Sequence, residues 1–300
     1  MNMVDFEYDG ELLSDYGCMI CSFDSSQDTV EIANKISVNN VKTPNAEKHM
    51  AVTSTYEEPL TFPFSICPSY SCGDDGSITG DTEGLSDEQI NEIMRWLNRR
   101  GYYKFSPVYD DESFEDVFFY GTFNAELVKF GDTVAGFNLT LQTNAPYGFI
   151  DMPTKKHTFN NDSLTYIDVS DEVGITYADA TIKCLEAGDF IIKNSLDPNN
   201  NVIIKNCSVN EVITLKGEQK IITTSEESHR TLCNDFNYHY IRMRNTYSNN
   251  KNIFTSNLKC ELSIDYTPIR KVGIILWWCS MKMDRYNSIL SYYQKEVMNI

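Results

Sequence analysis

The chain has 300 residues, of which 41% are hydrophobic and 12% are aromatic. That composition is enough to bury a core, and it argues against an intrinsically disordered chain. The formal net charge is −18, and it is uneven: residues 1–150 carry 25 acidic and 8 basic side chains, whereas residues 151–300 carry 18 and 17. An acidic half cannot neutralise phosphates, which argues against specific nucleic-acid binding. The asymmetry predicts two domains, although such charge also serves solubility.

The cysteines and the start of the chain indicate synthesis in a cytosol rather than secretion. There are nine Cys, an odd number, and Asp5, Glu7 and Asp9 stand where a basic and apolar signal would be. We therefore expect reduced thiols. No apolar run approaches the roughly 20 residues of a membrane-spanning helix, so we expect no membrane insertion. The longest run, Val272–Cys279, is predicted to be a buried strand.

Turn residues organise the first part of the chain. Asp9-Gly10 predicts a turn between two short strands, and Ser14–Gly17 predicts a second turn before a short strand at Cys18–Phe23. Pro59 and Pro63 bound a short apolar stretch that suits an edge strand or a loop. A strand is expected at Ala51–Tyr56, an edge strand or loop at Leu60–Phe64, and a surface loop at residues 71–84.

One helix is predicted at residues 87–100. Ser86 and Gln89 form a capping-box pattern, and Gly101 suits the C-terminal end. Acidic residues fill the first turn and arginines fill the last, which matches the helix dipole. The apolar positions recur at helical spacing: Ile90, Ile93, Met94 and Leu97.

Three strands are predicted after the helix, at Tyr102–Val108, Asp116–Glu126 and Thr133–Thr143. The last shows a clear period of two, because apolar and polar residues alternate from Phe137 to Gln142. The first domain, residues 1–150, is therefore predicted to be a β-barrel or sandwich with one packed α-helix.

The rest of the chain is predicted to be a second β domain. Residues 151–163 lie in a stretch rich in Pro and Asn and are predicted to be a linker. Many short strands without helices between them predict an antiparallel sandwich at residues 164–273. A terminal helix at Met281–Val297 is predicted within an extension, residues 274–300. The expected strands are Leu164–Val169, Ala180–Ala187, Asp189–Asn194, Asn201–Asn206, Glu211–Lys216, Lys220–Thr224, Tyr238–Asn245 and Asn257–Tyr266.

Candidate chemical sites are weak. Cys18, Cys21, Cys67 and Cys72 could form a zinc site, but their spacing is loose and small buried cysteines are commoner. The acidic loop at residues 71–84 lacks the alternating oxygen ligands of a calcium loop. No His accompanies a nucleophile motif, and no nucleotide-binding glycine motif is present. We expect no metal, no cofactor and no enzyme activity, and hence a structural role.

Residues 4–150 resemble phage distal tail proteins. The resemblance lies in the order of four features: the opening hairpin at Phe6–Gly17, a helix centred on Ile90–Leu97, strands through Gly136–Thr143, and an exit at Ala145–Tyr147. Beyond residue 160 the strands look like those of the galectin-like sandwich that many members carry. The loop at residues 71–84 and the extension depart from the family pattern.

The resemblance implies a tail-tube-like first domain that forms a hexameric ring at the tail tip, in the virion. It implies the tail tube protein and a tail fibre or receptor-binding protein as partners, and no catalysis. An acidic lumen would let DNA slide, because phosphates are repelled by carboxylates. Arg95, Arg99 and Arg100 lie off the apolar stripe of the helix, so we expect them either to pair with a neighbouring subunit or to be solvated.

Two alternatives belong to other functional classes. A carbohydrate-binding module would use exposed aromatic residues of the second domain, for which Tyr238, Tyr240 and Tyr247 are the candidates, although core packing also explains them. A baseplate-linked hydrolase would use a pair of carboxylates. Acidic pairs are expected by chance in a chain with 43 acidic residues.

Overall fold

In a computed structural model, the described residues are 3–23, 36–42, 47, 49–56, 58–72, 78–80, 84–110, 116–229, 231–246 and 248–271. They divide into two compact units, with the boundary between Gly148 and Phe149. Each unit has its own hydrophobic core. The predicted strand at Val272–Cys279 and the predicted terminal helix lie outside the described residues.

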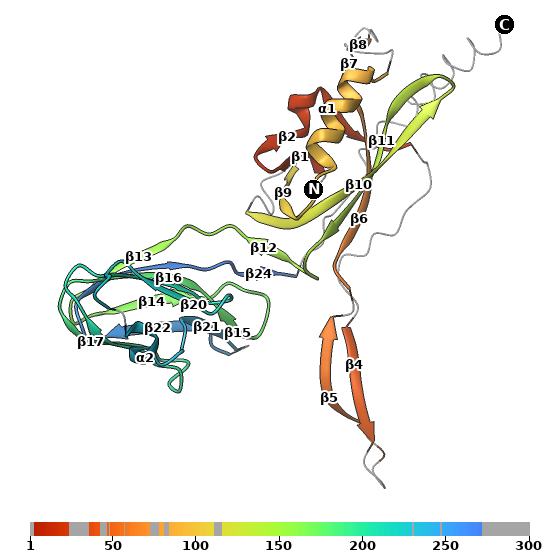
Figure 1. The fold of residues 1–300 in the computed structure, drawn as a ribbon. Helices are drawn as coiled ribbons and strands as arrows, with labels where there is room; N and C mark the ends of the chain where they lie inside the picture. Colours follow the sequence, from red (N-terminus) through yellow and green to blue (C-terminus); the bar gives the residue numbers. More distant parts are fainter. Residues whose placement is uncertain are drawn as a thin grey trace, which may run out of the picture. The chain divides into compact units, whose positions relative to one another are not determined.

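The first unit is built on one antiparallel sheet, whose strands run in the order β2-β1-β9-β10-β11-β6-β3 (Figure 1). The Asp9-Gly10 turn joins β1 to β2 as expected, with Asp9 at φ 55° and Gly10 at φ 87°. A 3-10 helix, η1 (Leu13–Tyr16), forms the second predicted turn. The strands are β1 (Met3–Tyr8), β2 (Glu11–Leu12), β3 (Cys18–Cys21), β6 (Thr61–Pro68), β9 (Tyr103–Tyr109), β10 (Val117–Phe130) and β11 (Thr133–Thr143).

Alternation along the strands decides which face of this sheet is buried. In β11, Phe137, Leu139 and Leu141 are buried, whereas Asn138 and Gln142 are exposed. This is the period of two expected for a sheet with one face against a core. The bounds of β11 are those predicted from the sequence, and the alternation holds from Phe137 to Thr143. Nearer the start of β11 the register with β10 shifts between Val128 and Lys129.

Helix α1 (Asp87–Leu97) covers the buried face, and Ile93, Trp96 and Leu97 enter the core. The capping box is present: the backbone N–H of Gln89 donates to Ser86 Oγ (3.3 Å), and the backbone N–H of Ser86 donates to Gln89 Oε1 (2.9 Å). The prediction that the helix reaches residue 100 is wrong. The backbone leaves the helix at Asn98, since the chain there must turn to enter β9.

The cap gives a testable expectation for the helix. Replacing Ser86 by alanine should lower the stability of α1 by about 1 kcal/mol, because the N–H of Gln89 loses its acceptor. Hydrogen exchange of the α1 amides measures the effect. Asn91→Ala, at an exposed position of the same helix, is the control and should be neutral or slightly stabilising. Equal exchange rates in both variants would contradict the role of the cap.

Two further hairpins belong to the first unit, and one of them corrects a prediction. Strands β7 (Tyr70–Cys72) and β8 (Ile78–Gly80) pair within the segment predicted to be a surface loop. The edge strand predicted at Leu60–Phe64 is confirmed for Thr61–Phe64, which begin β6 and pair only with β11, so Pro63 has a neighbour on one side. The later part of β6, Ser65–Pro68, pairs with β3. The other hairpin is β4 (Ile36–Lys42) with β5 (His49–Tyr56).

The second unit is an antiparallel sandwich, as the sequence predicts. One sheet has the order β13-β23-β16-β19-β20 and the other has the order β14-β22-β17-β18, with β15 and β21 as a separate pair. Strand β12 (Gly148–Ile150) pairs with β24 (Ile269–Arg270). The sandwich elements are β13 (Lys155–Phe159), β14 (Ser163–Ile167), β15 (Gly174–Tyr177), β16 (Asp179–Cys184), β17 (Gly188–Asn194), β18 (Val202–Cys207), β19 (Val212–Lys216), β20 (Ile221–Thr224), α2 (Leu232–Asp235), β21 (Arg242–Asn245), β22 (Lys251–Ser256) and β23 (Cys260–Asp265).

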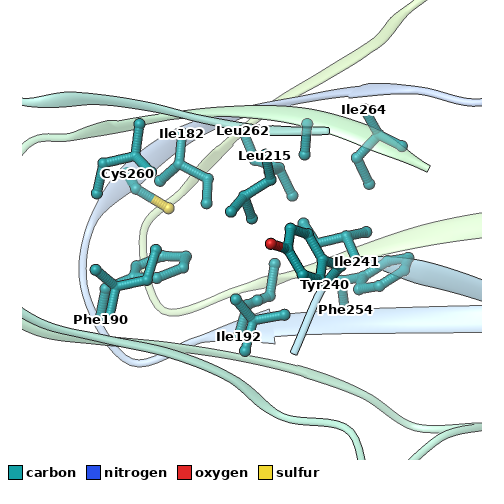
Figure 2. Close-up of a cluster of buried hydrophobic side chains, with 14 of the residues drawn as sticks. Ile182, Phe190, Ile192, Leu215, Tyr240, Ile241, Phe254, Cys260, Leu262 and Ile264 are labelled. Atoms are coloured by element: carbon teal, nitrogen blue, oxygen red, sulfur yellow. The ribbon is translucent and has the colours of Figure 1, made fainter. Parts of the chain in front are cut away.

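The core of the second unit lies between the two sheets (Figure 2). Ile182, Leu215 and Leu262 point inward from the five-stranded sheet, and Phe190 and Phe254 point toward them from the four-stranded sheet. Such interdigitation of two inner faces is what holds a sandwich together.

The prediction of a linker at residues 151–163 is wrong for Lys155–Phe159, which form strand β13. This strand pairs with β23 from Lys155↔Ile264 to Phe159↔Cys260, and Phe159 is buried. The helix α2 and the strands β15 and β22 were also not predicted. Strand β22 begins at Lys251, directly after polar residues that indicated only a loop.

Candidate functional site

The β4–β5 hairpin, called the ribbon below, carries five exposed apolar side chains. Among the described residues its two strands pair with each other and with no other strand. Every side chain of both strands is exposed or half-buried, with Met50 65% and Ile36 56% exposed. The other exposed apolar residues of the ribbon are Val38, Val41 and Val52. A two-stranded ribbon alone in water is marginally stable at best, so we expect another surface to cover this one.

The three arginines proposed for a subunit contact do not share one environment. Arg99 is held inside its own unit: Nε donates to the carbonyl of Trp96 (2.7 Å), and Nη1 lies 2.8 Å from Asp9 Oδ2. Its guanidinium also stacks 4.0 Å from the ring centroid of Tyr103. Arg99 therefore ties the end of α1 to the β1–β2 turn. Arg95 and Arg100 are exposed.

The three candidate tyrosines do not form one platform either. Tyr240 is 3% exposed and lies in the core of the sandwich (Figure 2), with its ring 5.2 Å from that of Phe236. Tyr238 is 61% exposed, and its hydroxyl donates to the carbonyl of Cys233 (2.9 Å). Tyr247 lies outside the described residues. The alternation that would place Tyr238 and Tyr240 together fails because Tyr238 has a positive φ of 58°.

A polar hollow of about 340 Å³ lies in the second unit. Its polar groups already have partners within the chain: Asn245 Nδ2 donates to the carbonyl of Ser170 (2.7 Å), and Asn250 Nδ2 donates to the carbonyl of Asp168 (2.8 Å). Asp171 pairs with Arg270 (3.2 Å). These contacts join loops, and they assign no ligand to the hollow.

A buried cluster of titratable groups connects the turn before β19, the loop after β20 and α2. His229 Nδ1 lies 2.7 Å from Glu211 Oε1, and His229 Nε2 lies 3.4 Å from Asp235 Oδ2. Glu211 also accepts from the backbone of Ser208 (2.8 Å) and from the hydroxyl of Thr224 (2.5 Å). Burial alone would raise the pKa of Glu211, but these hydrogen bonds outweigh it and hold the pKa below its usual value. No local sequence pattern indicates this cluster, because its members are separated along the chain.

Two cysteines of the first unit, Cys18 and Cys67, are core residues, and Cys21 is half-buried. Cys18 and Cys67 are buried, and burial raises the pKa of Cys18 to about 12. A hydrogen bond with Cys67, together with burial, raises the pKa of Cys21. Protonated thiols are poor metal ligands. Among the residues that the structure describes, no group of three or more His, Cys, Asp or Glu is placed to hold a metal ion. Over the same residues, no helix is long and apolar enough to cross a membrane.

Two family models match consecutive parts of the chain, up to residue 266. A model described as a phage tail protein N-terminal domain matches residues 1–145, and one described as a phage tail C-terminal domain matches residues 147–266. A comparison with curated proteins finds no match.

A similar solved structure is the SPP1 Dit (gp 19.1) protein, described as a paradigm of the hub adsorption apparatus in phages that infect Gram-positive bacteria. The match has a TM-score of 0.57 at 10% identity, and it covers 88% of this chain and 98% of that one. The expected resemblance to distal tail proteins is thus confirmed in the fold. The chain belongs to the phage tail protein family that the two models describe, and it is a mainly β protein with a Dit-like fold.

Proposed function

We propose that the chain is the structural hub of a phage tail tip. It forms a hexameric ring that joins the tail tube to baseplate or receptor-binding components, and DNA passes through the ring. The observation that supports this proposal is the likeness to the Dit fold, which extends over both units of the chain. The role is structural and not catalytic.

The ring is tested by negative-stain electron microscopy of the purified full chain. The expected result is six-fold rings, with a mass in solution six times that of one chain. A monomer at all concentrations tested would contradict the ring, and a ring of another symmetry would contradict the hexamer.

The charge of the first unit fits the passage of DNA. With 25 acidic against 8 basic side chains in residues 1–150, a ring built from this unit repels phosphate, so that the duplex slides. We propose that much of this negative charge faces the lumen and the outer rim. A reconstruction of the ring with a channel lined by Lys or Arg would contradict this placement.

The partners follow from the position of a hub. They are further copies of the chain, the tail tube protein, and a tail fibre or receptor-binding protein, in a virion whose parts are made in the host cytoplasm. Arg95 and Arg100, both exposed, are kept as proposed subunit contacts, whereas the intrachain contacts of Arg99 explain that residue without a neighbour. Glycan binding is not proposed, since Tyr240 is in the core.

A further inference from the structure

Three buried cysteines lie at one end of the sandwich of the second unit. Cys184 ends β16 and Cys260 begins β23, both in the five-stranded sheet, whereas Cys207 ends β18 in the four-stranded sheet. Each is at most 2% exposed, and all three thiols are free. Figure 2 shows the sulfur of Cys260 in the space between the two sheets. This end of the core therefore holds thiols from both sheets.

The backbone ties Cys184 to the turn that follows Cys207. The N–H of Cys184 donates to the carbonyl of Glu211 (2.9 Å), and the carbonyl of Cys184 accepts from the N–H of Asn210 (2.8 Å). The thiols of Cys184 and Cys207 are themselves in hydrogen-bond contact across the core. Two thiols in contact between facing sheets have the placement of an inter-sheet disulfide before its bond is formed.

Cys260 is the alternative partner for Cys184, but the contacts of its thiol make Cys207 the better choice. Cys184 and Cys260 are directly opposite each other in neighbouring strands. The thiol of Cys260, however, donates to Ser256 Oγ (3.7 Å), and burial raises the pKa of Cys260 to about 11. The hydrogen bond with Cys207 lowers the pKa of Cys184. Cys184 is thus the thiol that ionises most readily, and Cys207 is the thiol that it contacts.

We propose that Cys184 and Cys207 form a reversible disulfide by exchange with a small-molecule disulfide, such as oxidised glutathione. The pair stays reduced in a cytosol and closes where the surroundings are oxidising. The bond joins the two sheets of the sandwich at the end where the thiols lie. This inference rests on the proposed function only for the occasion of the change, since a virion protein leaves the cytosol in which it is made.

The exchange proceeds in two displacements. The Cys184 thiolate attacks one sulfur of the small disulfide, whose S–S bond breaks and releases a thiolate that takes up the proton lost by Cys184. The Cys207 thiolate then attacks the Cys184 sulfur of the mixed disulfide, and the second small thiolate leaves and takes up the proton lost by Cys207. Two protein thiols are oxidised, and one small disulfide is reduced to two thiols.

The reagent reaches the pair through the turn between β18 and β19. Val209 in this turn is 54% exposed, and the N–H of Ser208 donates to the Glu211 carboxylate (2.8 Å). Local opening of a short turn costs less than unfolding of the sheets, because fewer buried contacts are lost. The exchange should therefore be slower than that of the exposed thiol of Cys233, but it should go to completion without unfolding.

The test maps the bond in the full chain. Reduced protein is incubated in native buffer with graded ratios of oxidised to reduced glutathione, then alkylated and digested. Trypsin cleaves after lysine and arginine, so the three thiols fall on separate peptides, residues 184–193, 206–216 and 260–270. Mass spectrometry should find the first two peptides linked. The oxidised second unit should melt about 10 °C above the reduced one, because the bond restricts the unfolded chain.

Two variants and one condition provide the controls. Cys207→Ala should abolish the link and make the melting temperature independent of the glutathione ratio. Cys233→Ala removes an exposed thiol of α2 and should leave the link unchanged. In urea, the equilibrium constant for closing the pair should fall at least about tenfold, because only the folded chain holds the two thiols together.

The outcomes separate this inference from the ring. A link between residues 184–193 and 260–270 would overturn the choice of Cys207, and the absence of any link in native buffer would overturn the site. An equilibrium constant that is the same in urea would contradict the preformed contact. A chain that forms the link and stays monomeric would contradict the ring alone.

Discussion

Replacing Phe6 by alanine should lower the free energy of unfolding of the first unit by about 3–5 kcal/mol. Phe6 is fully buried at the centre of an aromatic cluster in which four rings lie within 6 Å of its own. They come from β6, α1, β9 and β10, so the loss of one ring opens a cavity that no single element can close. The rings are those of Phe64, Trp96, Phe105 and Phe123.

Urea unfolding of the full chain measures this effect as a lower midpoint for the first unit. Val4→Ala is the matched control, since Val4 is on the same strand and exposed; it should change stability by less than about 0.5 kcal/mol. Similar costs for the two variants would show that the cluster around Phe6 is not the centre of the core.

Replacing Glu211 by alanine should destabilise the second unit by about 3–5 kcal/mol at neutral pH. The carboxylate is buried, and its loss leaves His229, the hydroxyl of Thr224 and the N–H of Ser208 without their acceptor. Glu211→Gln keeps the shape of the side chain and should cost less. The exposed Glu227→Gln is the control and should behave like the wild type.

The same carboxylate makes stability depend on pH in a definite direction. The pKa of Glu211 in the folded chain lies below its ordinary value of 4.5, so its contribution is complete above that pH and is lost as the pH falls through the folded pKa. Asp235 acts in the same direction. A hydrogen bond from the hydroxyl of Thr231 lowers the pKa of Asp235 and outweighs desolvation, which would raise it. The gap between the urea midpoints of wild type and Glu211→Gln should therefore narrow below about pH 4.5. A gap that stays constant down to pH 3 would contradict this account.

The sequence predicted those elements whose signal is local. The period of two gave β11 its bounds, and the Ser86 capping box gave α1 its start. The arginines after Leu97 predict that the last turn of α1 continues. In the structure Arg99 instead folds back onto the carbonyl of Trp96, and the helix ends at Leu97. Strand β13 was missed because its partner, β23, lies about a hundred residues later, and local composition does not report such a pairing.

The candidate site was harder to predict than the fold. Ala51–Tyr56 is predicted to be a strand and lies within β5, but its residues do not indicate that none of its side chains is buried. Whether a strand is covered depends on the rest of the chain and on other copies. For Tyr238 and Tyr240 the difficulty is local. The sequence predicts that the two rings lie together, but the positive φ of Tyr238 leaves its ring exposed while the ring of Tyr240 is buried.

The ribbon also bears on how newly made subunits survive before assembly. Among the described residues, each of its strands pairs with another strand along one edge only, beside exposed Val and Met side chains. Such edges pair readily with any extended chain, so ordered assembly competes with aggregation. The yield of rings should then depend on the rate of synthesis, and slow expression at low temperature should favour rings over inclusion bodies.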